Sequence, residues 1–397
     1  MSSPDMSGHP AGADPVATAP VGPLTEAALD ELAATAADAA VVGLGESTRF
    51  SRETFEIRDQ LFRRLVRHHG FRTLVLQDSA DAGANLDRYV LGGAGSAASA
   101  LDGSWRPWRT GRMVAALEWI RAFNADHPGD PVRIFGVKPV QARPADYDAV
   151  LAHVARTAPD RLAQLESHLS PIRTAHDTDE HVQRARGTHP GRPFAHHARD
   201  AFALVESVTT GDPADGDALA RMRRILDFHQ RSVAGSGSYA GEAAGWAATV
   251  IDHERSGRPV VFWDGIAHTS AAPVTLGLAP ENGPQPTVGS LLRERYGSRY
   301  LSVAIGFHHG DLGVATVPDP APDLLDARLG EAGLASCWLD LRRDARPPWR
   351  GPARARVISG VYEPSRDSRE YLAVDSLTDA FDVLVQVRST TPADWLS

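Results

Sequence analysis

The chain of 397 residues contains one cysteine, Cys337, which excludes an internal disulfide and any metal site built from several cysteines. No apolar run approaches the length that spans a bilayer, and residues 1–20 show no cationic stretch followed by an apolar core, as a signal peptide would. We therefore expect a protein of the reducing cytoplasm that makes no membrane contact. Residues 1–20, rich in Ser, Pro, Ala and Gly, are interpreted as a disordered leader.

Positive charge is also in the minority, because 41 Lys and Arg stand against 50 Asp and Glu and give a formal charge of -9. This balance disfavours a nucleic-acid surface as the main purpose of the protein. Hydrophobic residues at 42% and charged residues at 23% are close to globular averages. The composition therefore indicates an ordinary folded protein.

Short apolar runs alternate with helical patterns over much of the chain. The run Ala39–Gly45 predicts a buried strand, and the apolar spacing from Arg52 to His69 predicts a helix that Gly70 closes. Further strands are expected at 71–76, 132–136, 259–263, 300–305 and 381–387, and further helices around 86–90 and 112–123. This alternation predicts an α/β fold, a mostly parallel central sheet flanked by helices.

Residues 144–256 differ from the rest, because they show long Ala- and Leu-bearing helical segments and no convincing strand. We expect an inserted helical subdomain there. The α/β core then comprises residues 21–143 and 257–397.

Polar residues follow the predicted strands at the point where each strand ends. In open α/β sheets, ligands bind beyond the carboxyl ends of the strands, so these positions are the candidate site. The strand exits are Glu46 to Arg49, Gln77 and Asp78, Lys138, Asp264 to His268, and Phe307 to His309.

The segment Gly45–Arg58 resembles the signature of the erythromycin esterase family, Gly-Glu-Ala-Thr-His-Gly followed by Arg-Glu-Phe-Phe-Glu-Leu-Arg. Shorter matches follow at 87–93, 108–110, 118–124, 358–362 and 381–382, so the resemblance covers nearly the whole chain. It implies an α/β core with a helical subdomain, a cleft between them, and metal-independent hydrolysis of an ester such as a macrolactone. It also implies that Glu46 and Arg58 belong to the site.

The chain departs from the family pattern at several of its polar positions. The histidine that the resemblance implies as the activator of water falls on Arg49, a glutamate falls on Gln77, and an aspartate falls on Lys138. Of two histidines three residues apart, the first falls on Gly265 and only His268 remains. Arginine keeps its proton at any working pH and glutamine carries no charge, so neither serves as a base.

These replacements make the expected cleft more positive by one, one and two formal units at positions 49, 77 and 138, or four in total. We therefore expect an anionic substrate or intermediate, held as in an oxyanion site. His268 is the best remaining candidate for proton transfer near neutral pH. Glu46 has a second interpretation, in which it complements the dipole of the following helix.

The adjacent histidines His308 and His309 are expected to point apart on one strand, without a carboxylate motif, so we expect no metal and no cofactor. One of the two tryptophans near position 106 is expected to pack in the core, with Arg109 facing the cleft. The expected catalytic residues are Glu46, Arg49, Gln77 and His268, and the expected substrate-binding residues are Arg58, Trp105, Trp108, Arg109, Lys138, Asp264, His308 and His309.

Three functions fit these observations. The first is a metal-independent tailoring enzyme of bacterial secondary metabolism, which acts on a polyketide-like or macrolide-like substrate by cyclisation, elimination or isomerisation. Such steps need proton transfer and an oriented substrate but no activated water. The second is an ester or lactone hydrolase of the erythromycin esterase type, in which Glu46 or His268 has taken over as base. The third is a non-catalytic protein that binds a natural product such as an antibiotic.

Overall fold

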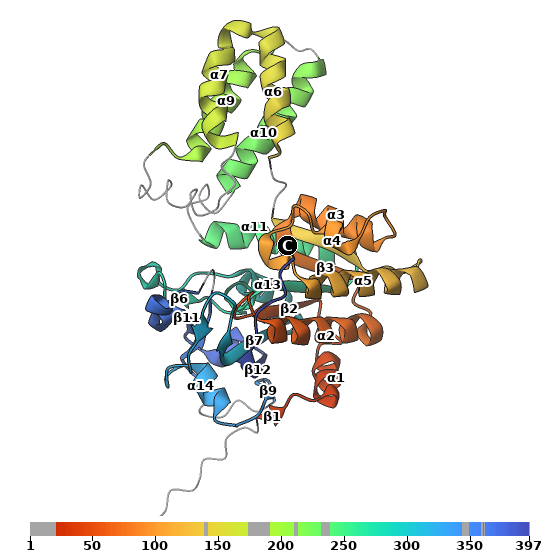
Figure 1. Ribbon diagram of the computed structural model, residues 1–397, viewed down its shortest axis with the longest axis vertical. Coiled ribbons are helices and arrows are strands. Elements are labelled where there is room, and N and C mark those ends of the chain that lie inside the picture. Colours follow the sequence, from red (N-terminus) through yellow and green to blue (C-terminus); the bar gives the residue numbers. More distant parts are fainter. Residues whose placement is uncertain are drawn as a thin grey trace, which may run out of the picture.

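The computed structural model describes residues 21–138, 142–173, 191–209, 213–231, 239–343, 349–358, 360 and 362–396. The leader expected over residues 1–20 lies outside these ranges. Figure 1 shows a domain built on a sheet and, at one end of the molecule, a separate group of helices.

The main sheet has the strand order β1-β9-β12-β7-β2-β5-β3-β4, and β8 pairs with β7. Neighbouring strands from β12 to β4 along this order run parallel, whereas β1, β8 and β9 pair antiparallel. The predicted α/β fold with a mostly parallel sheet is therefore confirmed. The strands are β1 Gly22–Pro23, β2 Val41–Glu46, β3 Thr73–Ser79, β4 Arg133–Lys138, β5 Val260–Gly265, β7 Tyr300–Asp311, β8 Thr316–Val317, β9 Ser336–Asp340 and β12 Val383–Thr390.

Helices cover both faces of this sheet, as the alternation of side chains along a strand requires. On β2, Val42 packs with residues of α2 and α5, whereas Val41 packs with residues of α11 and α13 on the other face. The α-helices of this domain are α1 Glu26–Thr35, α2 Arg52–His69, α3 Ala80–Val90, α4 Ala97–Ala100, α5 Gly111–Asp126, α11 Tyr239–Glu254, α12 Ile266–Thr269, α13 Val288–Tyr296, α14 Leu325–Gly330 and α15 Leu377–Ala380.

Helix α2 shows why the sequence predicted its bounds so well. The Ser51 side chain accepts a hydrogen bond from Thr54 N and caps the first turn. Gly70, with a φ of 72°, takes the left-handed conformation that ends the helix at little cost for glycine. The buried residues Phe55, Phe62 and Val66 lie on the face that packs against the sheet.

A second sheet of three short antiparallel strands, in the order β10-β11-β6, packs beside β9 and β12. The sequence did not predict it, because two-residue and four-residue strands carry too little periodicity. Its strands are β6 Thr275–Leu276, β10 Ala353–Arg356 and β11 Tyr371–Val374. The short 3-10 helices are η1 Arg106–Trp108, η2 Pro159–Arg161, η3 Pro280–Asn282, η4 Gly297–Arg299 and η5 Pro364–Arg369.

Within the described residues, the separate group of helices comprises α6 Pro144–Thr157, α7 Leu162–Arg173, α9 Phe194–Ser207 and α10 Pro213–Arg231. It has an apolar core of its own, which includes Tyr147, Leu169 and Val205. Helix α11 follows in the chain but packs on β3, β4 and β5, so it lies between this group and the strands (Figure 1). None of the helices in the described ranges has both the length and the apolar character of a membrane span.

Candidate active site at the strand ends

Charged and polar side chains gather where the parallel strands β2, β5, β3 and β4 end side by side. This group, called the strand-end cluster below, brings together residues from the strands, from the loop after β2 and from α2, α11 and α12. Its members are Glu46, Arg49, Arg58, Gln77, Asp78, Lys138, Glu242, Asp264 and His268.

Gly45 allows the end of β2 to approach the short helix α12. A Cβ at this position would lie 2.0 Å from Thr269 Oγ1 and 2.9 Å from Ile266 Cα, so a side chain would push α12 away. Ser47, which follows Glu46, is held by two backbone hydrogen bonds: Ser47 N donates to Ile305 O at 2.9 Å, and Ile358 N donates to Ser47 O at 2.8 Å. The glycine and these bonds fix the backbone on either side of Glu46.

Glu46 forms a buried ion pair with Arg58, whose Nη1 lies 2.9 Å from Glu46 Oε1. The side chains are only 2% and 1% exposed. The Arg58 guanidinium lies within 4.7–5.1 Å of three aromatic ring centres, those of Phe55, Trp108 and Trp263. Burial raises the pKa of Glu46 and lowers the pKa of Arg58, and the attraction between the two charges opposes both shifts.

Arg49 is held between two side chains of neighbouring strands. Its Nη2 donates to Asp264 Oδ1 at 2.6 Å and also to Gln77 Oε1. Asp264 is fully buried, and its Oδ1 accepts a further bond from Gly265 N at 2.6 Å. A Cβ at Gly265 would lie 3.2 Å from Arg49 Nη1, so the guanidinium occupies the space beside the glycine. The Asp264 carboxylate beside Arg49 offsets part of the additional positive charge expected from the sequence.

Lys138, the only lysine of the chain, lies at the end of β4 among aromatic rings and carboxylates. Its Nζ is 4.5 Å from the ring centre of Trp105 and 5.6 Å from that of Trp246. Burial lowers the pKa of Lys138, and the Glu242 carboxylate is the largest opposing influence. Burial also raises the pKa of Glu242 to about 7, although Lys138 opposes the shift.

The sequence left open whether Glu242 is a site residue or a surface acid of a helix, and it was not counted among the expected site residues. It lies on α11 in a stretch without a recognisable family motif, and only the packing of α11 over the ends of β3, β4 and β5 brings it to the cluster. An acidic residue on a helical pattern is ordinarily solvated. No signal in the sequence separates Glu242 from such a residue.

His268 on α12 lies against two aromatic rings of α11. Its ring stacks on Tyr239 with centres 5.0 Å apart and lies at the same distance from Trp246. Burial lowers the pKa of His268, with Asp264 opposing the shift. The Nδ1 atom makes no hydrogen bond among the described residues. A neutral imidazole of this kind can accept a proton.

The two neighbouring tryptophans have different environments. Trp108 is 1% exposed, belongs to the core and donates its Nε1–H to Gln77 O at 3.1 Å. Trp105 is 38% exposed, and the Arg49 guanidinium lies 4.8 Å from its ring centre. Arg109 lies apart, with its Nη2 4.0 Å from Asp102 on the surface.

His308 and His309 lie near the end of β7 and contact each other and Asp319. Their Nδ1 atoms are 2.9 Å apart, so the expectation that the two side chains point apart is wrong. Alternation along a strand fixes the directions of the Cβ atoms, but both rings turn so that Nδ1 faces the Asp319 carboxylate.

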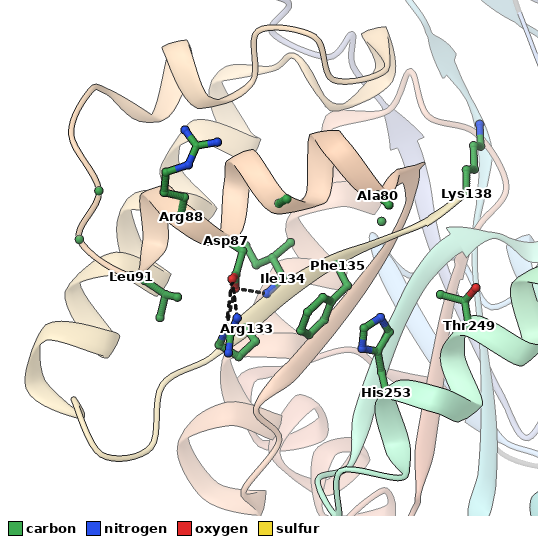
Figure 2. A pocket seen from close by; sticks show the side chains of 14 residues that line it. Ala80, Asp87, Arg88, Leu91, Arg133, Ile134, Phe135, Lys138, Thr249 and His253 are labelled. Carbon is green, nitrogen blue, oxygen red and sulfur yellow. Dashed lines mark hydrogen bonds and ion pairs between the residues drawn. The ribbon is translucent and has the colours of Figure 1, made fainter. Parts of the chain in front are cut away.

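A groove of about 890 Å³ runs along β4 between α3 and α11 (Figure 2). Figure 2 shows Arg133, paired with Asp87 at 2.8 Å, toward one end and Lys138 at the other. The groove is in the size range of small-molecule sites. By contrast, the space beside Glu46 and Arg49 measures about 10 Å³. Lys138 thus connects the strand-end cluster to a space large enough for a ligand.

A parallel sheet with polar residues at its strand ends belongs to the class of α/β scaffolds in which ligands bind at the carboxyl edge of the sheet. The chain belongs to the erythromycin esterase family, whose model matches residues 66–390. That family comprises hydrolytic enzymes. The match begins after Arg58, so the equivalence of Glu46, Arg49 and Arg58 rests on the resemblance of their own segment.

Three solved structures share the fold. A Bacillus cereus protein is 21% identical with a TM-score of 0.63, and the match covers 95% of this chain and 97% of that one. A succinoglycan biosynthesis protein is 20% identical with a TM-score of 0.63, over 94% and 95% of the two chains. The erythromycin esterase EreC, a histidine-to-asparagine mutant in its open conformation, is 18% identical with a TM-score of 0.61, over 93% and 95%.

Proposed function

We propose that this protein is a tailoring enzyme that rearranges a polyketide-like or macrolide-like natural product by acid-base chemistry without a metal. The reaction class is cyclisation, elimination or isomerisation. The observation that carries this proposal is that the Arg49 guanidinium is held in the strand-end cluster by Gln77 and Asp264. The guanidinium occupies the position of the implied water-activating histidine. A group that keeps its proton does not activate water.

The proton-transfer groups are Glu242 and His268, with Lys138 beside them. A carboxyl with a pKa of about 7 both accepts and donates protons near neutral pH. Glu242 removes a proton next to a substrate carbonyl, and the Lys138 ammonium stabilises the resulting enolate oxygen. Return of that proton to another carbon completes an isomerisation. In an elimination, the electron pair of the enolate expels a β-hydroxyl group, which takes the proton from Glu242 and leaves as water. The transient enolate accounts for the anionic intermediate expected from the sequence.

Ester hydrolysis is the second candidate. It is favoured by the hydrolytic character of the family and by the neutral, partly buried ring of His268, whose Nδ1 makes no hydrogen bond to any described residue. In this alternative His268 takes the proton of the attacking water. The substrate ester would lie in the groove beside Lys138.

The two candidates differ in the mass of the product. The protein is incubated in ¹⁸O-labelled water with candidate metabolites, chosen as the compounds that the enzymes encoded by neighbouring genes produce. The products are analysed by mass spectrometry. Unchanged mass, or loss of one water, without ¹⁸O supports the proposal. A gain of one water with ¹⁸O in a new carboxyl group contradicts it and establishes hydrolysis. Glu242→Gln serves as the variant and Glu206→Gln, on the distant helix α9, as its control. A ligand that binds tightly without turnover also contradicts the proposal and indicates a binding protein.

A further inference from the structure

The end of β7 carries donor atoms that the strand-end cluster does not use. His308 Nδ1 and His309 Nδ1 lie 2.9 Å apart. Asp319 Oδ1 lies 3.5 Å from the first and 3.0 Å from the second. Within the part of the chain that the structure describes, these three residues form the one group of histidine and carboxylate ligands close enough to share an ion.

We propose that His308, His309 and Asp319 bind a divalent ion of the first transition row, such as Zn²⁺. An ion with bonds of about 2.1 Å keeps neighbouring ligand atoms about 3.0–3.4 Å apart, and the three distances here lie around that range. Two imidazoles and one carboxylate on one side of an ion are a recurrent ligand set that leaves further positions for water.

One His309 Nδ1–H shared between His308 Nδ1 and Asp319 Oδ1 accounts for the two shorter contacts, but it leaves the third, between His308 and Asp319, without a proton. A neutral imidazole carries one N–H, so if His308 Nδ1–H donates to His309 Nδ1, no N–H remains between His309 and Asp319. If both Nδ1–H groups donate to Asp319, two donors face each other across 2.9 Å. A cation attracts the lone pairs of all three atoms at once.

The surrounding residues hold the ligands in place. Arg356 Nη1 donates to His308 O at 2.5 Å and to Pro318 O at 3.1 Å, so it ties the end of β7 to the residue next to Asp319. At Gly330, a Cβ would lie 2.3 Å from His308 Cδ2, and its absence lets the imidazole lie against α14. Such outer contacts orient metal ligands before the ion arrives.

The proposed site is reachable from solvent. The side chain of His308 is 10% exposed, that of His309 34% and that of Asp319 77%. An ion therefore enters past Asp319, and its remaining coordination positions face water. Binding at this site is independent of the reaction proposed above, and it is measured without substrate.

The test is Zn²⁺ binding by the full-length chain, without an affinity tag, after treatment with a chelator and dialysis. We expect one tightly bound equivalent in titration calorimetry. Asp319→Asn and His309→Asn are each expected to weaken it by more than about tenfold. Gly330→Ala keeps all three ligands but displaces the His308 ring, and it is also expected to weaken binding. Circular dichroism checks that each variant is folded.

The matched control is the double variant His68→Asn with His69→Asn. These histidines are also adjacent in sequence, but they lie at the end of α2 with ring centres 6.4 Å apart. The control is expected to bind Zn²⁺ like the wild type. The proposal fails if the wild type holds no equivalent, or if the control loses as much affinity as Asp319→Asn.

Discussion

Two parts of the strand-end cluster use charge in opposite ways. At the end of β2, Glu46 and Arg58 form a closed ion pair with almost no exposed surface and about 10 Å³ of space beside Glu46. At the end of β4, Lys138 and Glu242 have displaced pKa values, and Lys138 lines the large groove. The closed pair is suited to holding the fold of the site, and the open pair to exchanging protons with a ligand.

Breaking the closed pair is expected to have the largest effect. Arg58→Met leaves the buried Glu46 carboxylate without its partner, which costs about 3–5 kcal/mol of unfolding free energy. The loss should shrink as the pH falls, because Glu46 in the variant can then protonate. Urea denaturation measures it, with Arg255→Met as control, since the Arg255–Asp252 pair is about two-thirds exposed. A loss as small as that of the control would show that the pair contributes little.

The open pair is tested through Glu242→Gln. If Glu242 transfers protons, turnover should fall by about a hundredfold or more, and the limb of the pH profile near 7 should disappear.

A measurement of the stability of the wild type and of Glu242→Gln against pH needs no substrate. Because folding raises the pKa of Glu242 from 4.5 to about 7, the wild type should lose stability as the pH rises through this window. The glutamine variant should lose less. Parallel stability curves for the two proteins would contradict the assigned pKa.

The pKa of Lys138 can be probed by chemical modification, because Lys138 is the only lysine of the sequence. Reductive methylation at a series of pH values, read by peptide mass, gives the pH at which its amine becomes reactive. That pH should be lower than for the lysine introduced at an exposed position by Arg255→Lys, since burial lowers the pKa of Lys138. The midpoint of each curve is compared and not its height, so restricted access does not affect the result. Equal midpoints for the two lysines would show that the pKa of Lys138 is not lowered and would contradict its place in the open pair.

The smallest effect is expected from Trp105→Leu, which lies between the two parts. The Trp105 ring contacts both Arg49 and Lys138, and each cation-π contact contributes about 0.5–1 kcal/mol. Removing the ring should lower the melting temperature slightly and admit water to Lys138, so that its reactivity midpoint rises. Val314→Ala, at a residue 51% exposed, is the control. An unchanged Lys138 midpoint would show that the ring does not shield the amine.

The sequence predicted the parts of the molecule that depend on local patterns. Buried parallel strands read as apolar runs, and the Ser51 and Gly70 caps fixed α2. The rule that parallel strands end at one edge placed Glu46, Gln77, Lys138 and Asp264 together.

What the sequence missed depends on tertiary packing. Glu242 reaches the cluster because of where α11 packs. Asp264 pairs with Arg49 although the two residues are 215 positions apart in the sequence. The meeting of His308 and His309 depends on ring rotation about a carboxylate further along the chain. Periodicity carries no information about such contacts.

The close approach of Arg49 to Gly265 couples the choice of residue at these two positions. The family resemblance of the sequence implies histidines at both positions, and here a Cβ at 265 would lie 3.2 Å from Arg49 Nη1, so the guanidinium would have to shift. Restoring histidine at 265 alone would therefore crowd Arg49, whereas restoring histidine at 49 alone would remove the charged partner of the buried Asp264. Each single reversal is penalised. The residues at 49 and 265 are therefore coupled, and we expect histidine to be accommodated at both positions together more readily than at either one alone.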